Sequence, residues 1–201
     1  MIKIIGVTGP SGSGKTLLTE HFEKRGVPVI DADALYHSML IPPSPCLDAI
    51  RKNFGDGVVS PDGTLDRAAL GTLVFNDSEK LKLLNSTVLG MVLDRIRELI
   101  RELEKQGSSA VIVDAPTLIE SGFHRECDTV VSVIAPVADR IVRICARDDI
   151  TEEKARERVA AQKNDEFYKS HSHHTVYNNG TLDVFTESIR AVEKLLALDD
   201  N

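Results

Sequence analysis

Short apolar runs alternate along the chain with longer segments in which apolar residues recur every three or four positions. The runs lie at 2–7, 27–30, 110–113 and 129–134. Continuous apolar runs of this length are typical of strands buried on both faces of a parallel sheet. The segments 15–24 and 65–105 have helical spacing instead. This alternation predicts an α/β protein with a doubly wound parallel sheet.

The length of 201 residues and the absence of any linker predict a single domain, residues 1–201, with insertions. We expect its core to be formed by residues 1–35, 106–147 and 171–201. The residues 62–105 are expected to form a helical insertion. The densely charged segment at about 148–170 is typical either of a solvated helix face or of a mobile lid over phosphates.

Composition and charge exclude several classes of protein. Hydrophobic residues make up 42% and charged residues 27%, as in an ordinary globular domain. The net charge of −7 argues against a broad nucleic-acid surface. The sequence contains no run of 18 apolar residues, so it predicts no membrane-spanning helix. The start of the chain lacks a signal-peptide pattern and the three cysteines are widely spaced, so we expect a cytoplasmic protein.

The strongest motif follows the first apolar run. It reads G-x-x-x-x-G-K-[ST] and comprises Gly9, Pro10, Ser11, Gly12, Ser13, Gly14, Lys15 and Thr16. Glycines let the backbone wrap around a phosphate with its N–H groups turned inward, and the following helix adds its positive end. Lys15 is expected to reach the β- and γ-phosphates, and the Thr16 hydroxyl to bind Mg²⁺. The motif therefore predicts a nucleotide-phosphate site.

Carboxylates follow two of the predicted strands. Asp114 ends the run at 110–113, where an acid can hold Mg²⁺ beside the threonine of the loop or simply cap a helix. Asp31 and Asp33 follow the run at 27–30, at the edge where a parallel sheet receives its ligand. One of these two could accept the proton of an acceptor hydroxyl, and spacing alone does not choose between them.

A group of arginines recurs in the predicted helix after residue 136. Arg140, Arg143 and Arg147 have helical spacing, and Arg143 and Arg147 share one face. Such a cluster could neutralise a transferring phosphoryl group or belong to a solvated face. Spacing leaves both interpretations open.

These residues together resemble the dephospho-coenzyme A kinase family of P-loop kinases, over nearly the whole chain. The family's D-A-D motif is matched by residues 31–33, and its R-x-x-x-R and R-x-x-x-Q pairs by Arg143, Arg147, Arg158 and Gln162. Its spaced F-G…D-G-x-L-D-R…L-G…V-F signature is matched between residues 54 and 75, and its late I-x-N-x-G turn by residues 176–180.

The resemblance implies a P-loop three-layer sandwich with about five parallel strands, a helical acceptor-binding insertion and a lid. It implies transfer of the ATP γ-phosphate to the ribose 3′-hydroxyl of dephospho-coenzyme A, with ATP and Mg²⁺ as cofactors. Its implied site residues are Asp33 as catalytic base, Lys15, Arg143 and Arg147 around the phosphoryl group, Arg67 and Glu120 at the acceptor, Asn178 near the adenine, and Thr16 and Asp114 at the metal. Neither a membrane nor a nucleic acid is an expected partner, and the oligomeric state is left open.

The departures from the family pattern lie mostly on the acceptor side. Ser86-Thr87 stands where the family usually has H-P, and Thr117 falls within its P-L-L-F-E segment. Two alternatives therefore stay open: a P-loop kinase of another small hydroxylated acceptor, such as a nucleoside or nucleotide, and an ATP-binding regulator without transferase activity.

Overall fold

The computed structural model describes residues 1–75 and 77–196, which divide into two compact units. The sheet unit comprises residues 1–30 and 102–196, and the helical unit comprises residues 31–101. The helical unit contains most of the 62–105 insertion expected from the sequence. It also contains residues 31–61, which include the D-A-D motif at residues 31–33.

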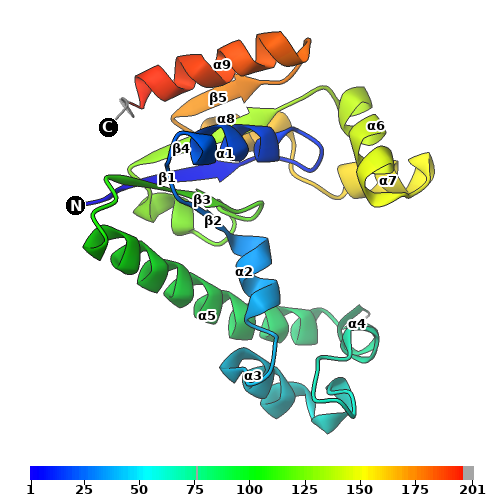
Figure 1. Ribbon diagram of the computed structural model, residues 1–201. Coiled ribbons are helices and arrows are strands. Elements are labelled where there is room, and N and C mark those ends of the chain that lie inside the picture. Colours follow the sequence, from blue (N-terminus) through cyan, green and yellow to red (C-terminus); the bar gives the residue numbers. More distant parts are fainter. Residues whose placement is uncertain (76, 197–201) are drawn as a thin grey trace. The chain divides into compact units, whose positions relative to one another are not determined.

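A five-stranded sheet forms the centre of the sheet unit (Figure 1). Its strands are β1 (Lys3–Thr8), β2 (Val29–Asp31), β3 (Ala110–Asp114), β4 (Thr129–Ile134) and β5 (His174–Tyr177). Their order is β2-β3-β1-β4-β5, and β1 pairs in parallel with both β3 and β4. The predicted α/β fold with a parallel sheet of about five strands is confirmed.

The central strands are apolar because both of their faces are covered. In β3, Ala110 is 4% exposed and the next three residues are fully buried. Gly6 of β1 shows how tightly one face is covered, since a Cβ built there would lie 2.6 Å from Leu118 and 2.8 Å from Cys127 Sγ. The segment after β3 therefore packs directly on the middle of the sheet.

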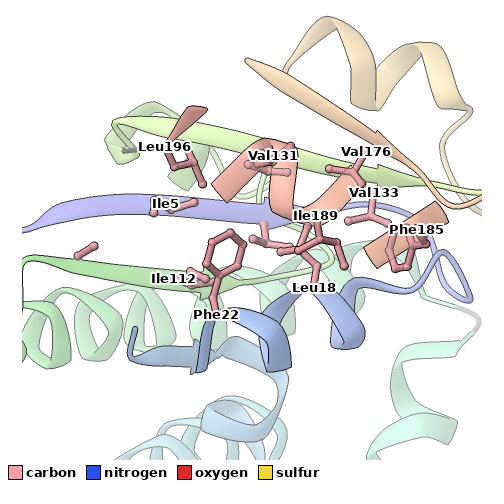
Figure 2. Close-up of a cluster of buried hydrophobic side chains, with 13 residues drawn as sticks. Ile5, Leu18, Phe22, Ile112, Val131, Val133, Val176, Phe185, Ile189 and Leu196 are labelled. Carbon is pink, nitrogen blue, oxygen red and sulfur yellow. The ribbon is translucent and has the colours of Figure 1, made fainter. Parts of the chain in front are cut away.

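The helices of the sheet unit follow its strands. They are α1 (Lys15–Lys24), α6 (Val137–Asp148), α7 (Glu152–Ala160), α8 (Asp165–Ser170) and α9 (Leu182–Leu195), with a 3-10 turn at Phe123–Glu126. Helices α1 and α9 cover the same face of the sheet (Figure 2), where Phe22 and Phe185 pack against strand residues such as Ile5 and Val131. This packing fixes where α1 begins, and so fixes the end of the glycine loop.

The helical unit contains α2 (Ala32–Ser38), α3 (Pro45–Phe54), a 3-10 turn at Asp56–Val58, α4 (Arg67–Phe75) and most of α5 (Ser78–Lys105). A proline-rich turn precedes α3. Ser44 caps the helix by accepting a hydrogen bond from Leu47 N (2.9 Å), with proline in the first turn. Leu84, Val88 and Met91 of α5 pack against the unit's own apolar cluster.

None of the helices formed by residues 1–75 and 77–196 is long and apolar enough to cross a membrane.

An ion cluster ties α9 to α1. Glu193 is only 7% exposed, and its carboxylate accepts hydrogen bonds from Arg25 Nε (2.8 Å) and from His21 Nε2 (3.0 Å). Burial alone would raise the pKa of Glu193, but the hydrogen bonds from His21 and Arg25 outweigh it and hold the pKa below its usual value.

We predict that Glu193→Gln destabilises the protein at pH 7 by about 1–3 kcal/mol, because a charged acceptor of two hydrogen bonds is lost. The folded carboxyl has the lower pKa, so its contribution is present above the unfolded pKa of about 4.3 and is lost as the pH falls further. The difference between wild type and variant in urea denaturation should therefore shrink below about pH 4.

The matched control is Glu187→Gln, at an exposed position of the same helix. An equal effect of both substitutions at pH 7 would mean that Glu193 contributes only general charge.

Candidate active site

The glycine loop leads from β1 into α1 and packs against neighbouring elements at two of its glycines. Gly12 has φ +76°, and a Cβ there would lie 2.7 Å from the backbone oxygen of Arg140. Gly14 caps α1 with φ +103°, and a Cβ there would lie 2.5 Å from Asn178 Nδ2. Both positions therefore need glycine, for the left-handed backbone and for the space.

Three consecutive carbonyls of the loop each accept a hydrogen bond from a distant side chain. The donors are Arg140 Nε to Ser11 (3.0 Å), Arg143 Nη1 to Gly12 (3.2 Å) and Asn178 Nδ2 to Ser13 (2.8 Å). Two come from α6 and the third follows β5. The outward side of the loop is therefore held by side chains from two different elements.

The inward side of the loop is left available to an anion. In a peptide group the N–H points away from the C=O, so holding these carbonyls turns the amides of Gly12 and Gly14 to the other side. Among the described residues, these two amides donate no hydrogen bond, and the buried Ser13 Oγ has no partner. A concave set of donors of this kind fits phosphate oxygens.

Lys15 and Thr16 open α1 beside this cradle. Lys15 Nζ donates to the carbonyl of Gly9 (2.8 Å), so the ammonium lies along the loop. Thr16 is exposed at the positive end of the helix. Asp114 ends β3 opposite Val7, two residues before the loop. The structure thus brings the predicted loop, its lysine and Asp114 to the same edge of the sheet.

The two predicted lid arginines have different partners. Arg143 contacts the loop, and its Nη2 also donates to Asn178 Oδ1 (3.3 Å). Arg147 instead donates two hydrogen bonds to Asp148 (2.8 and 3.0 Å), which also accepts from Arg158 of α7. The hydrogen bonds from Arg147 hold the pKa of Asp148 at about 2. Arg147 is therefore linked to α7 through a shared carboxylate.

The structure distinguishes the two aspartates of the D-A-D motif. Asp31 caps α2, and its Oδ1 accepts from the backbone N–H groups of Asp33 and Ala34 (both 2.9 Å). The Asp33 side chain is exposed, and no residue described in the structure donates a hydrogen bond to its carboxylate. The capping role of Asp31 leaves Asp33 as the carboxylate available to a ligand.

The two residues expected to contact the acceptor substrate, Arg67 and Glu120, are both exposed. Arg67 begins α4 in the helical unit and lies near Tyr36. Burial raises the pKa of Tyr36, negative charge on Cys46 raises it further, and the positive charge of Arg67 lowers it by less. Glu120 belongs to the turn region after β3 in the sheet unit.

Ser86 and Thr87, where α5 differs from the family pattern, form hydrogen bonds with nearby residues. The hydroxyls of Ser86 and Thr87 both donate to the carbonyl of Leu83 (3.0 and 2.7 Å), and Thr87 Oγ1 accepts from Asn53 Nδ2 (3.0 Å). Thr87 therefore connects α5 to α3 within the helical unit.

The contact of Arg140 with the glycine loop was not predicted from the sequence. Its side chain is buried against the loop, and both it and Ser11 N donate to Gln162 Oε1 (2.6 and 3.1 Å). A signal was present in the sequence, because Arg140 precedes the apolar Ile144 by four positions and so falls on the buried stripe of an amphipathic helix. A charge on such a stripe indicates a buried polar contact.

The five-stranded parallel sheet and the glycine loop between β1 and α1 are those of a P-loop kinase. A shikimate kinase from Acinetobacter baumannii (17% identity, TM-score 0.51, 100% of this chain and 97% of that chain) and a dephospho-CoA kinase from Campylobacter jejuni (24%, 0.73, 98% of both chains) share the fold. The structure of TT1252 from Thermus thermophilus is more similar, with 32% identity and a TM-score of 0.79 over 98% of this chain and 97% of that one.

Residues 3–183 match the dephospho-CoA kinase family, and the chain belongs to it. Similar relatives include the dephospho-CoA kinases of Thermobifida fusca, 38% identical over 90% of this chain and 89% of the relative, and of Shouchella clausii, 37% identical over 88% and 90%. The protein is therefore an enzyme that transfers a phosphoryl group.

We predict that Gly12→Ala weakens ATP binding by at least about tenfold, because the new methyl meets the Arg140 backbone and moves the loop. Isothermal titration with ATP measures the effect. Gly63→Ala is the matched control, since Gly63 has a similar φ of +83° but open space around it. Wild-type affinity in Gly12→Ala would show that this loop does not bind the phosphates.

Proposed function

We propose that the protein transfers the γ-phosphoryl group of ATP to the ribose 3′-hydroxyl of dephospho-coenzyme A, giving coenzyme A and ADP. The observation that carries the proposal is the glycine loop, in which the carbonyls of Ser11, Gly12 and Ser13 are held by side chains while the amides of Gly12 and Gly14 donate to no described residue. Family membership supports the identity of the acceptor.

The loop binds the triphosphate in this proposal. The backbone from Ser11 to Thr16 surrounds the β- and γ-phosphates, and Lys15 leaves the Gly9 carbonyl to contact the phosphate charge. Asn178, which the family resemblance places near the adenine, is buried and donates to the Ser13 carbonyl, and its place near the adenine stays a prediction.

Magnesium is part of the same proposal. The Thr16 hydroxyl and the Asp114 carboxylate are hard oxygen donors, which Mg²⁺ prefers, and they flank the loop at its two ends. These residues fit the ion and would hold it. A bound Mg²⁺ would offset negative charge on the bridging phosphate oxygens.

Transfer requires that the acceptor hydroxyl lose its proton. We assign this proton to Asp33, whose carboxylate is not used in capping. The 3′-oxygen forms a bond to the γ-phosphorus while the bond to the β–γ bridging oxygen breaks, and ADP leaves with that electron pair. Arg143 and Arg147 would surround the phosphoryl group and exclude water, and Arg67 and Glu120 would contact the acceptor.

A cytoplasmic location belongs to the same proposal. It is supported by the three cysteines, Cys46, Cys127 and Cys145, all of which are free thiols.

The proposal predicts ADP release from MgATP only when dephospho-coenzyme A is present, with coenzyme A as the second product. A coupled assay compares this acceptor with nucleosides, nucleoside monophosphates and no acceptor. Release with another acceptor would leave the kinase assignment intact and overturn the substrate. Measurable ATP binding without release in any mixture would favour a non-catalytic regulator.

Two variants separate the roles of Lys15 and Asp33. Asp33→Asn should lower kcat by about 10²–10⁴-fold because the proton acceptor is lost, while the Kd for ATP stays within about twofold. Lys15→Ala should lower kcat by about 10²–10³-fold and also weaken ATP binding, since a charge on the phosphates is lost. Asp31→Asn is the control for Asp33, because it retains a capping oxygen. Wild-type turnover by Asp33→Asn would disprove the assignment of the base.

A further inference from the structure

Arg140 is a buried cation without a carboxylate partner in the part of the chain that the structure describes. It is 3% exposed, and its neighbours Ile141 and Ile144 are buried with it. Burial lowers the pKa of Arg140, and the nearby Asp165 raises it by less. A buried guanidinium is costly unless its surroundings compensate the charge. Its position against the phosphate loop therefore calls for a functional account.

The two acceptors of Arg140 are both neutral and both belong to one small network. Its Nε donates to the Ser11 carbonyl (3.0 Å) and its Nη2 to Gln162 Oε1 (2.6 Å). The same oxygen of Gln162 accepts the backbone N–H of Ser11 (3.1 Å). Ser11 is thus held at both of its backbone polar groups.

Holding Ser11 fixes the direction of the next amide. The Ser11 carbonyl and the Gly12 N–H share one planar peptide group and point in opposite directions. Arg140, by binding the carbonyl from behind, turns the Gly12 N–H toward the phosphate side. A Cβ built on Gly12 would lie 2.7 Å from the Arg140 backbone oxygen, so α6 and the glycine loop pack closely at this point.

We propose that Arg140 is a positioning residue for the nucleotide: together with Gln162 it holds Ser11 so that the Gly12 amide faces the phosphates, and it does not itself touch the nucleotide. The inference rests on the proposed function only for the identity of the nucleotide, and it is independent of the acceptor. It assigns Arg140 a role different from the one proposed for Arg147, which is linked to α7 through Asp148 and would act at the phosphoryl group.

Nucleotide affinity distinguishes this role from direct contact with the transferred group. A side chain bound to the γ-phosphate favours ATP over ADP, whereas an amide of the loop that binds the β-phosphate serves both nucleotides, because both carry that phosphate. We therefore expect Arg140→Gln to weaken binding of MgATP and MgADP by the same factor, about tenfold or more. Isothermal titration without acceptor measures both, and the KM for dephospho-coenzyme A should stay unchanged.

Further variants test the geometry. Arg140→Lys keeps the charge but cannot donate in two fixed directions, so it should restore only part of the affinity. Gln162→Met, at a half-buried position, should weaken both nucleotides as well, and the double variant Arg140→Gln with Gln162→Met should lose less than the product of the two effects. Arg156→Gln is the control, because Arg156 pairs with Glu152 on the exposed side of α7.

Three results would overturn the proposal. Weaker ATP binding with unchanged ADP binding would place Arg140 on the γ-phosphate. A lower Tm with both affinities unchanged would show that Arg140 has a purely structural role. Wild-type nucleotide affinity in Arg140→Lys would show that only the positive charge of Arg140 matters. Failure of the wild-type protein to bind either nucleotide would instead refute the proposed function.

Discussion

A peptide group carries its N–H and its C=O on opposite sides, so a loop that offers amides to a phosphate must turn its carbonyls toward something else. Much of the sheet unit meets this constraint. Helix α6 supplies two arginines, the residue after β5 supplies an amide, and the segment after α7 supplies a glutamine that accepts from the loop. The sheet order matters for the same reason, because β1 lies between β3 and β4 and delivers the loop to the edge where these donors meet.

The predicted site residues are divided between the two units. The described side chains that hydrogen-bond to the backbone of Ser11, Gly12 and Ser13 belong to the sheet unit, whereas Asp33 and Arg67 belong to the helical unit. The boundary between the units falls between Ile30 and Asp31, immediately before the D-A-D motif, and the Asp31 side chain caps α2. The substitutions that depart from the family pattern in α5 are likewise bonded within the helical unit. Under the proposed assignment of Arg67 to the acceptor, acceptor recognition can change without altering the hydrogen bonds that hold the glycine loop.

What the sequence predicted was local. The apolar runs, the glycine motif and the start of α1 at Lys15 depend on neighbouring residues, and the structure confirms the resulting fold. The supports of the loop depend instead on packing between elements far apart in the chain. Gln162 and Asn178 lie more than 140 residues after Ser11 and Ser13, and nothing in local spacing indicates that they meet. Arg140 and Arg143 look alike as part of one helical series, yet only the fold shows that both face the loop. The roles of the site residues in transfer stay predictions.

The central position of β1 has a consequence for synthesis of the protein. The ribosome produces β1 and the glycine loop first, but the neighbouring strands begin only at residues 110 and 129, and the loop's supports lie as late as residue 178. During this interval the nascent chain carries an apolar strand with no pairing partner, which is the kind of segment that aggregates or recruits chaperones. Contacts of such long sequence separation also form slowly. A fragment that stops before residue 178 therefore displays the complete nucleotide motif while lacking part of what holds it in shape.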